Sequence, residues 1–227
     1  MALIYIKDVG DGVRMGLWRM DEEPDQLYVC YSHLRCLAMP FRSVGRQKEY
    51  LSVRALLQAM TGDDTLCIRH EESGRPVVCR GLVKRDDMLV SISHTRGYAV
   101  LMLSRTKAVG VDIEYRSDRI VKIASHFIRP DEMVGSVEQM LALWCAKETL
   151  YKLHSEDSLH YFDMRQVEST APAAGADDWD LVLENMKRGE RVTVHVTLTP
   201  DYCLTWAVSS STNPCQPGGQ PRTTAFS

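Results

Sequence analysis

The sequence predicts an α+β fold in which two similar α/β lobes share one chain, and three observations favour it. Apolar residues alternate in strand fashion in both halves of the 227-residue chain, and each half contains one long segment with helical spacing. The halves also share a short internal echo, in which 48–54 is similar to 147–152 and 98–104 is similar to 202–209. A duplication would give two related lobes with a ligand cleft between them, whereas a chance similarity would leave the halves unrelated.

The first half is predicted to be a group of strands around one helix. Residues 46–60 have apolar side chains three and four positions apart, which predicts a helix. The tight connection Ser104–Lys107 predicts a hairpin between strands 98–104 and 107–114. The other predicted strands of this half are 2–6, 13–19, 66–69, 77–79 and 89–93.

The second half is predicted to alternate helices and strands in a similar way. A helix is expected at 120–127, Pro130–Glu132 indicates a further helix start, and 138–154 has the longest helical pattern of the chain. We divide the chain into an N-terminal lobe (1–105), a C-terminal lobe (106–210) and a disordered tail (211–227) rich in Ser, Thr, Pro and Gly. Strands are expected at 179–183, 191–198 and 202–209.

The composition excludes several classes of protein. A net charge of -3 argues against a general nucleic-acid binder, which would carry a basic excess. The seven cysteines are odd in number and form no Cys-x-x-Cys pair, so reduced thiols are expected rather than a disulfide framework or a zinc site. No segment has the pattern of a signal peptide or a membrane span, and we expect a cytoplasmic protein without membrane contact.

Two acidic side chains lie in the apolar run Ala108–Glu114. Because side chains alternate along a strand, Asp112 and Glu114 should point to the same face, roughly 7 Å apart. Like charges on a buried strand repel, so a cation is expected between them, and Mg²⁺ is the simplest candidate. Alternatively, the acids lie at a strand end and pair with Arg116 and Arg119.

An acid and a base lie on one face of the long helix, where Trp144, Glu148 and Lys152 follow at four-residue intervals. They could supply a proton acceptor and a positive charge to the same site as the strand carboxylates. The alternative is an ordinary surface pair of Glu148 with Lys152, which stabilises a helix by only about 0.2–0.5 kcal/mol.

Phosphate binding would depend on side chains rather than on a glycine-rich loop. Neither Gly-x-x-x-x-Gly-Lys nor the Gly-x-Ser-x-Gly of serine hydrolases occurs. Ser93 and His94 lie at a strand end, where they could bind a phosphate oxygen or could be structural. The basic side chains that could contribute are Arg46, Lys48, Arg54, Arg75, Lys147 and Lys152, each of which could also be a solvated surface charge.

Four segments in order resemble the 4'-phosphopantetheinyl transferase superfamily. Val109-Gly-Val-Asp-Ile-Glu114 and Trp144-Cys-Ala-Lys-Glu-Thr-Leu-Tyr-Lys152 are similar to its two signature motifs. Gly74-Arg-Pro76 and Ile92-Ser-His-Thr95 are similar to two weaker ones. The chain length resembles the two-lobed, surfactin-synthetase-activating type. That resemblance implies a monomer with pseudo-twofold symmetry and its active site at the lobe interface.

The resemblance also implies a reaction. Coenzyme A would be the substrate, and its 4'-phosphopantetheine arm would pass to a serine of an apo acyl or peptidyl carrier protein, releasing adenosine 3',5'-bisphosphate. Mg²⁺ would be held by Asp112, Glu114 and Glu148, with Glu148 and Lys152 as catalytic residues. A non-catalytic carrier-binding homologue and a Mg²⁺-dependent phosphoester hydrolase are the alternatives. Residues expected to bind coenzyme A are Arg46, Arg54, Arg75, Ser93, His94, Lys147 and Lys152.

Overall fold

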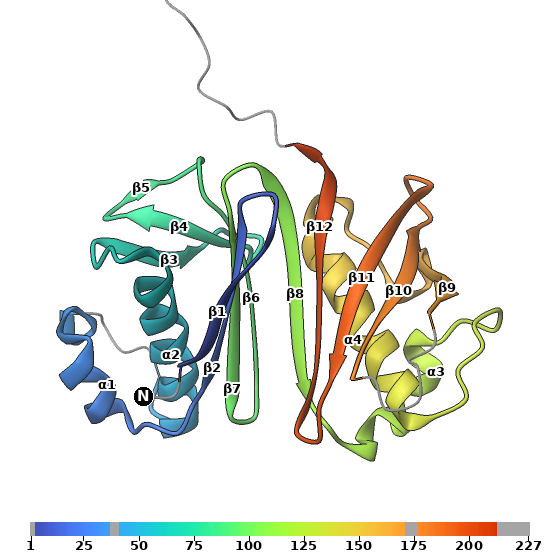
Figure 1. Ribbon diagram of the computed structural model, residues 1–227, viewed down its shortest axis with the longest axis horizontal. Helices are drawn as coiled ribbons and strands as arrows, with labels where there is room; N and C mark the ends of the chain where they lie inside the picture. Colours follow the sequence, from blue (N-terminus) through green and yellow to red (C-terminus); the bar gives the residue numbers. More distant parts are fainter. Residues whose placement is uncertain (1–2, 37–40, 171–176, 213–227) are drawn as a thin grey trace, which may run out of the picture.

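A computed structural model describes residues 3–36, 41–170 and 177–212, and it confirms the α+β class. The N-terminal half, residues 3–104, contains a four-stranded antiparallel sheet in the order β1-β2-β7-β6 (Figure 1). A small sheet in the order β3-β4-β5 and two α-helices complete this half. The four-stranded sheet comprises β1 (Leu3–Gly10), β2 (Val13–Arg19), β6 (Leu89–Thr95) and β7 (Tyr98–Ser104), and the rest are α1 (Pro24–Cys30), α2 (Val44–Thr61), β3 (Leu66–His70), β4 (Pro76–Arg80) and β5 (Val83–Lys84).

The C-terminal half, residues 107–212, is built on a five-stranded antiparallel sheet in the order β8-β12-β11-β10-β9. The long helix α4 (Val137–Leu153) packs on this sheet, and the short helix α3 (Ala124–Phe127) precedes it (Figure 1). The strands are β8 (Lys107–Tyr115), β9 (Met164–Ser169), β10 (Asp178–Asn185), β11 (Glu190–Leu198) and β12 (Tyr202–Thr212).

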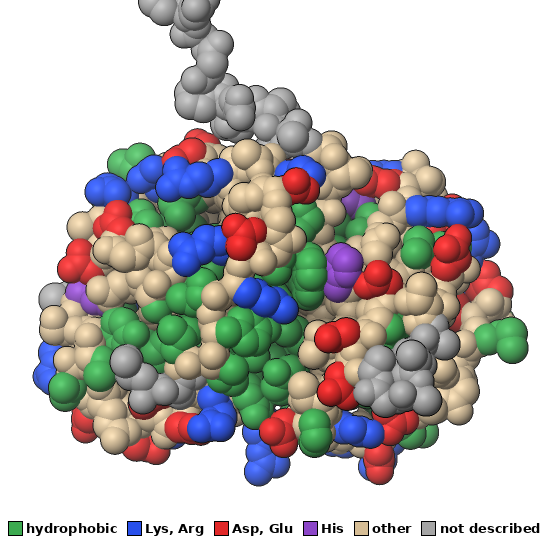
Figure 2. All heavy atoms as spheres, viewed as in Figure 1, with side chains coloured by type: hydrophobic (Ala, Val, Ile, Leu, Met, Phe, Trp, Pro, Cys, Tyr) green, Lys and Arg blue, Asp and Glu red, His purple; other side chains and the backbone are tan. Residues whose placement is uncertain are grey.

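Three apolar cores follow from strand alternation. Apolar side chains of α2 pack on one face of the first sheet, and those of α4 pack on one face of the second. Between the sheets, alternate residues of β2 and β7 meet Val109, Val111 and Ile113 of β8. Hydrophobic side chains gather on the visible surface along the seam between the halves (Figure 2). The strand alternation thus leaves the other residues of β8, among them Asp112, to the face that α4 covers.

Each long helix crosses its sheet next to a strand glycine. An added Cβ at Gly16 of β2 would lie 2.7 Å from Leu56 Cδ1 of α2. An added Cβ at Gly110 of β8 would lie 2.3 Å from the backbone oxygen of Thr149 in α4. The close approach at Gly110 brings α4 directly against β8, two residues before Asp112.

Several sequence expectations about connections were wrong. Strands β7 and β8 do not form a hairpin: β7 pairs with β2 and β6, whereas β8 pairs with β12, so the chain changes sheets at Ser104–Lys107. Residues 130–132 do not start a helix, and α4 begins at Val137 after the N-cap Ser136. Strand β12 runs to Thr212, two residues into the predicted tail, and the tail residues 213–227 lie outside the described part of the chain.

Two further expectations concern thiols and membranes. The five described cysteines for which side chains are placed, namely 30, 67, 79, 145 and 203, are all free. No helix of the described residues combines the length and the apolar character needed to cross a bilayer.

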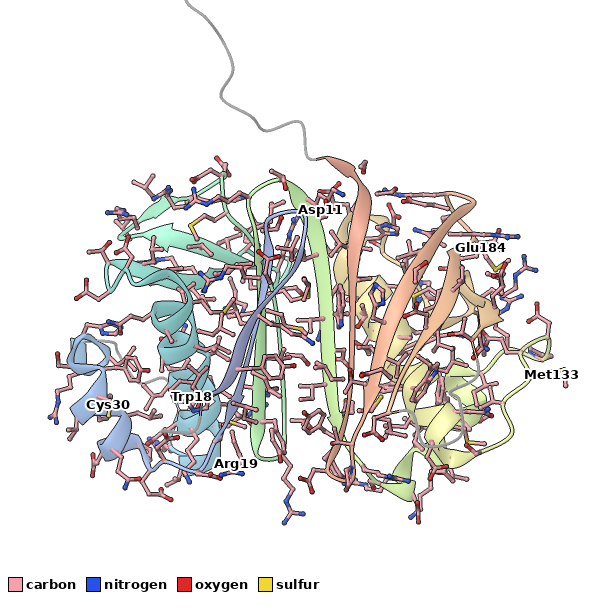
Figure 3. The ribbon with its side chains drawn as sticks, viewed as in Figure 1. Asp11, Trp18, Arg19, Cys30, Met133 and Glu184 are labelled. Carbon is pink, nitrogen blue, oxygen red and sulfur yellow. The ribbon has the colours of Figure 1, made fainter. Side chains whose placement is uncertain are left out.

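Figure 3 illustrates how side chains divide between the core and the surface. Trp18 is buried and turned toward α2, whereas Met133 is 93% exposed at the outer edge.

Candidate functional site

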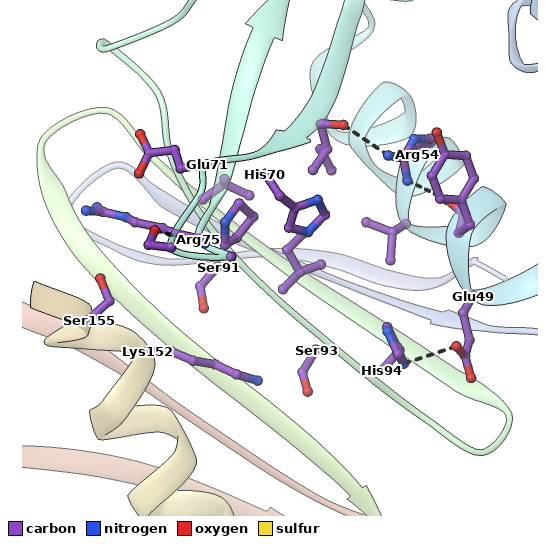
Figure 4. Close-up of a pocket in the computed structure, with 18 of the residues that line it drawn as sticks. Glu49, Arg54, His70, Glu71, Arg75, Ser91, Ser93, His94, Lys152 and Ser155 are labelled. Atoms are coloured by element: carbon purple, nitrogen blue, oxygen red, sulfur yellow. Dashed lines mark hydrogen bonds and ion pairs between the residues drawn. The ribbon is translucent and has the colours of Figure 1, made fainter. Parts of the chain in front are cut away.

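A cavity of about 830 Å³ lies beside α2, β3, β4 and β6, and the C-terminal end of α4 closes it. Six of the seven residues expected to bind coenzyme A line it: Arg46, Arg54, Arg75, Ser93, His94 and Lys152. Lys152 extends from α4 toward Ser93 of β6 (Figure 4). The structure therefore gathers cations from both halves around one space. Apolar lining comes from Phe41, Tyr50, Val53, Ile68, Pro76, Val90 and Ile92.

The cations of the cavity differ in how far they are already engaged. Arg54 is buried, donates to the carbonyl oxygens of Tyr50 and Ile68 at 3.0 Å each, and lies 3.3 Å from the centre of the Tyr50 ring. Arg46 pairs with Glu49, and Arg75 makes a long pair with Glu156 at 3.4 Å. Arg46 and Arg75 are therefore freer than Arg54 to meet an anion.

His94 lies beside Glu49 in the same cavity. Its Nδ1 is 3.7 Å from Glu49 Oε2 (Figure 4). Burial lowers the pKa of His94, and the Glu49 charge opposes that shift. The lower pKa favours the neutral imidazole, which can still donate one hydrogen bond to a phosphate oxygen.

Lys147 is the exception among the expected ligands. It is completely buried, and its Nζ donates to Glu132 Oε2 at 2.8 Å, to Phe127 O at 2.7 Å and to Tyr161 O at 3.3 Å. All three protons of the ammonium group are therefore used, and burial lowers the pKa of Lys147. We correct its assignment to a structural residue that ties α4 to the segments before and after it.

Asp112 lies behind the cavity and is joined to it by two of the lining residues. Asp112 Oδ1 accepts hydrogen bonds from Lys152 Nζ and from Ser93 Oγ, both at 2.7 Å. Lys152 also donates to the carbonyl oxygen of Val111 at 3.0 Å. Neither Asp112 nor Glu114 lines the cavity itself, and Lys152 and Ser93 connect the cavity to Asp112.

Hydroxyl groups at alternate positions of β6 join it to β8. Ser91 Oγ accepts from the amide of Val111 at 3.1 Å, and Thr95 Oγ1 accepts from the amide of Tyr115 at 3.0 Å. With Ser93 between them, these hydroxyls take the place of a backbone ladder at the boundary of the two sheets. The link fixes the position of Asp112 relative to His94 and its neighbours.

Two aromatic residues hold the remaining carboxylates. Trp144 Nε1 donates to Glu114 Oε1 at 3.4 Å, and the hydroxyl of Tyr161 donates to Glu148 Oε1 at 2.5 Å. The rings of Trp144 and Tyr161 stack with their centres 4.9 Å apart. Trp144 belongs to a sequence motif, but nothing in the sequence pointed to Tyr161, which follows α4 in a short 3-10 helix (Tyr161–Asp163) outside both motifs.

The electrostatics of the acids are coupled. Burial raises the pKa of Glu114, and the charge of Asp112 raises it further. Burial also raises the pKa of Glu148, to which Asp112 adds, while the hydrogen bond from Tyr161 and the charge of Lys152 oppose the shift. A carboxylate with a raised pKa is a stronger proton acceptor.

The three acids have the right donor atoms for a divalent cation, but their side chains are not grouped around one point. Within 3–36, 41–170 and 177–212, no three Asp, Glu, His or Cys side chains are grouped so that they could hold a metal ion. The donors nevertheless suit a hard cation, because all are carboxylate oxygens and Asp112 Oδ2 is buried without a hydrogen-bond partner. Metal binding by Asp112, Glu114 and Glu148 stays a prediction.

Comparison with known proteins bears on the same part of the chain. Residues 108–207, which include α4 and most of β8 and β12, match the family model of the 4'-phosphopantetheinyl transferase superfamily. A search of curated proteins gave no significant match. Asp112, Glu114, Glu148 and Lys152 all lie inside the matched segment, which contains both signature motifs. The part of the chain that carries both motifs and these four side chains therefore resembles the 4'-phosphopantetheinyl transferase superfamily.

Proposed function

We propose that this chain transfers the 4'-phosphopantetheine arm of coenzyme A to a serine of an apo acyl or peptidyl carrier protein. The observation that carries the proposal is the large cavity, whose cations come from both halves and whose far wall is connected by Lys152 and Ser93 to Asp112. Coenzyme A is a phosphate-rich molecule with an aromatic base, and the cavity offers cations beside aromatic and aliphatic walls. The two-lobed, surfactin-synthetase-activating type remains the preferred subclass.

Positively charged and neutral donors of the cavity would bind and orient the substrate. Arg46, Arg75 and His94 would hold phosphate oxygens, because their remaining N–H groups are free to donate. Lys152 would stabilise charge at the diphosphate, since it already reaches the cavity from α4. Arg54 would act mainly by supporting the wall formed by Tyr50 and Ile68.

Proton transfer is assigned to Glu148. Its raised pKa makes it a better acceptor for the proton of the attacking serine than an ordinary exposed carboxylate would be. Tyr161 would orient it through the 2.5 Å hydrogen bond. When bound by the three carboxylates, Mg²⁺ would neutralise charge on the diphosphate.

Mass spectrometry of a carrier protein tests the proposal directly. The chain would be incubated with coenzyme A, Mg²⁺ and a panel of apo carriers from fatty acid, polyketide and nonribosomal peptide synthesis. We expect at least one carrier to gain the mass of one phosphopantetheine group. Cleavage of coenzyme A with every carrier mass unchanged would instead indicate a hydrolase, and no consumption of coenzyme A would indicate a binding protein.

Substitution of Asp112 tests the acidic site. Asp112→Ala should lower transfer by about 10²–10³-fold, because it removes a carboxylate from the proposed charge-stabilising centre. It should also abolish any Mg²⁺-dependent rise in melting temperature, a measurement that does not depend on catalysis. The matched control is Asp180→Ala, which removes a carboxylate from β10 that pairs only with His195 among the described ion pairs. Full activity of Asp112→Ala in Mg²⁺ would contradict the proposed role.

A further inference from the structure

A second cavity, of about 240 Å³, lies in the N-terminal half, and its walls carry four arginines. They come from separate elements: Arg14 from β2, Arg80 from β4, Arg85 from the segment before β6, and Arg105 from the turn after β7. Gly12 also lines this cavity. It lies in the turn between β1 and β2, next to Asp11, which is labelled in Figure 3. None of these residues lines the large cavity.

The charges around this second cavity do not balance. Its lining includes one carboxylate, Asp63, which Arg80 contacts at 2.7 Å. Asp87 pairs with Arg85 at 2.7 Å and with Arg105 at 3.6 Å. Four guanidinium groups therefore face two aspartates, in a chain whose overall net charge is -3. The local excess of positive charge favours an anion.

The guanidinium groups also keep unused donors. Arg14 donates one hydrogen bond, to the carbonyl oxygen of Met60 at the C-terminal end of α2. Arg80 donates one, to Asp63, and the side chain of Arg105 is 71% exposed. Since each guanidinium has five N–H groups, the described partners leave most of these donors available. Capping of α2 by Arg14 explains one arginine of the four but not their convergence on one space.

We propose that this cavity binds a small phosphate-type oxyanion. Guanidinium groups recognise tetrahedral oxyanions through paired hydrogen bonds, which several arginines can share. The volume of 240 Å³ is several times the roughly 30 Å³ that one water occupies, so phosphate or pyrophosphate enters with hydrating waters. It is too small for a nucleotide such as coenzyme A, so it is a site for a free anion.

Anion binding there would stabilise the wall of the large cavity. Helix α2 and strands β3 and β4 line both cavities, at opposite ends of each element. In β3, Leu66 lines the arginine cavity and His70 lines the large cavity. In β4, Arg80 lines the arginine cavity and Pro76 lines the large cavity. An anion that bridges Arg14 of β2 and Arg80 of β4 would therefore hold these elements together.

Calorimetric titration with sodium phosphate, and separately with sodium pyrophosphate, tests the proposal in the full chain without coenzyme A. Because the large cavity can also attract phosphate, the titrations use Arg75→Gln as a background in which that cavity is weakened. We expect saturable anion binding to persist in the Arg75→Gln protein. Adding Arg80→Gln and Arg105→Gln together should lower the affinity for the anion by at least about tenfold, since each substitution removes a charged hydrogen bond to the anion.

The matched control adds Arg69→Gln and Arg191→Gln instead, which remove the same charge outside both cavities. If Arg80→Gln disturbs folding, the exposed Arg105→Gln alone should still weaken binding, whereas Arg191→Gln alone should not. No saturable binding in Arg75→Gln, or equal binding by the arginine-cavity variant and its control, would overturn the proposal. Neither result depends on transferase activity, so the outcome is separate from that of the proposed function.

Discussion

The dipeptide Lys-Glu occurs on both long helices, at 48–49 in α2 and at 147–148 in α4, and the two copies have different surroundings. Each lysine pairs with a glutamate that precedes its helix: Lys48 with Glu23 at 2.7 Å, and Lys147 with Glu132 at 2.8 Å. The first pair is at the surface, with the Glu23 side chain 61% exposed, whereas both side chains of the second are fully buried. Identical residues thus make a solvated pair in one half and a buried one in the other.

The glutamates of the two dipeptides differ in the same way. Glu49 faces the cavity beside Arg46 and His94, which are cationic or titratable partners. Glu148 accepts a hydrogen bond from the neutral hydroxyl of Tyr161 and has a raised pKa because it is buried. Burial rather than residue type therefore distinguishes the two copies: Glu49 lies among charged or titratable side chains, whereas Glu148, our proposed proton acceptor, has a raised pKa.

The largest expected effect separates the two lysine pairs. Glu132→Gln should lower the free energy of unfolding by about 3–5 kcal/mol, because it leaves the buried Lys147 without a carboxylate. Glu23→Gln should cost at most about 1 kcal/mol, since Lys48 can turn to solvent. Urea unfolding measures both values. Replacing both partners, Glu132→Gln with Lys147→Met, should recover part of the loss. Equal costs for Glu132→Gln and Glu23→Gln would contradict the comparison.

The next effect concerns the two glycines under the helices. Gly110→Ala should cost about 3 kcal/mol, because its Cβ would lie 2.3 Å from the backbone oxygen of Thr149, which can move only with α4. Gly16→Ala should cost about 1 kcal/mol, because its nearest atoms, in Leu56 and Met60, are the ends of flexible side chains. Urea unfolding again decides, and a larger loss for Gly16→Ala would show that α2 is the more rigidly seated helix.

A smaller effect is expected where Tyr161 holds Glu148. Tyr161→Phe should lower kcat for carrier modification by about tenfold with little change in KM, because the carboxylate loses its orienting hydrogen bond. The fold should keep the ring stack on Trp144, so the melting temperature should fall only slightly. Tyr28→Phe, in α1 of the other half, is the matched control. An unchanged kcat would remove Tyr161 from the site.

Much of the candidate site follows from strand and helix periodicity. Alternation in 108–114 predicted that Asp112 and Glu114 share a face, and the packing of Val109, Val111 and Ile113 between the sheets agrees with it. Helical spacing predicted that Glu148 and Lys152 lie near each other, although Lys152 bonds Asp112 rather than Glu148. These predictions depend only on local backbone geometry, which a short sequence determines.

What the sequence did not reveal depends on contacts between distant segments. Lys147 lies in the same motif as Lys152, and only the buried position of Glu132 distinguishes their roles. The false hairpin had suitable local turn residues, but β2, β6 and β12 supply the actual strand partners. By contrast, the sequence does contain a local signal for α1, which we did not predict. Glu23, Pro24 and Gln26 have the pattern of a capped helix start.

The smallest expected effect uses the two histidines that lie beside glutamates. His154, after α4, lies 3.7 Å from Glu190, and its Nδ1 is 2.9 Å from the side-chain amide of Asn185, which donates to it when the imidazole is neutral. Burial lowers the pKa of His154, so the unfolded chain binds this proton more readily than the folded chain. The free energy of unfolding should therefore fall as pH decreases through the unfolded value of about 6.5, by at most about 1.4 kcal/mol per pH unit. His154→Gln, which can still accept a hydrogen bond from Asn185, should flatten the curve of unfolding free energy against pH between about pH 5 and 7.

His94→Gln should flatten that curve less, because the His94 side chain is 38% exposed against 5% for His154. A curve that His94→Gln flattens more than His154→Gln would mean that the cavity, rather than the end of α4, is the more strongly desolvated environment.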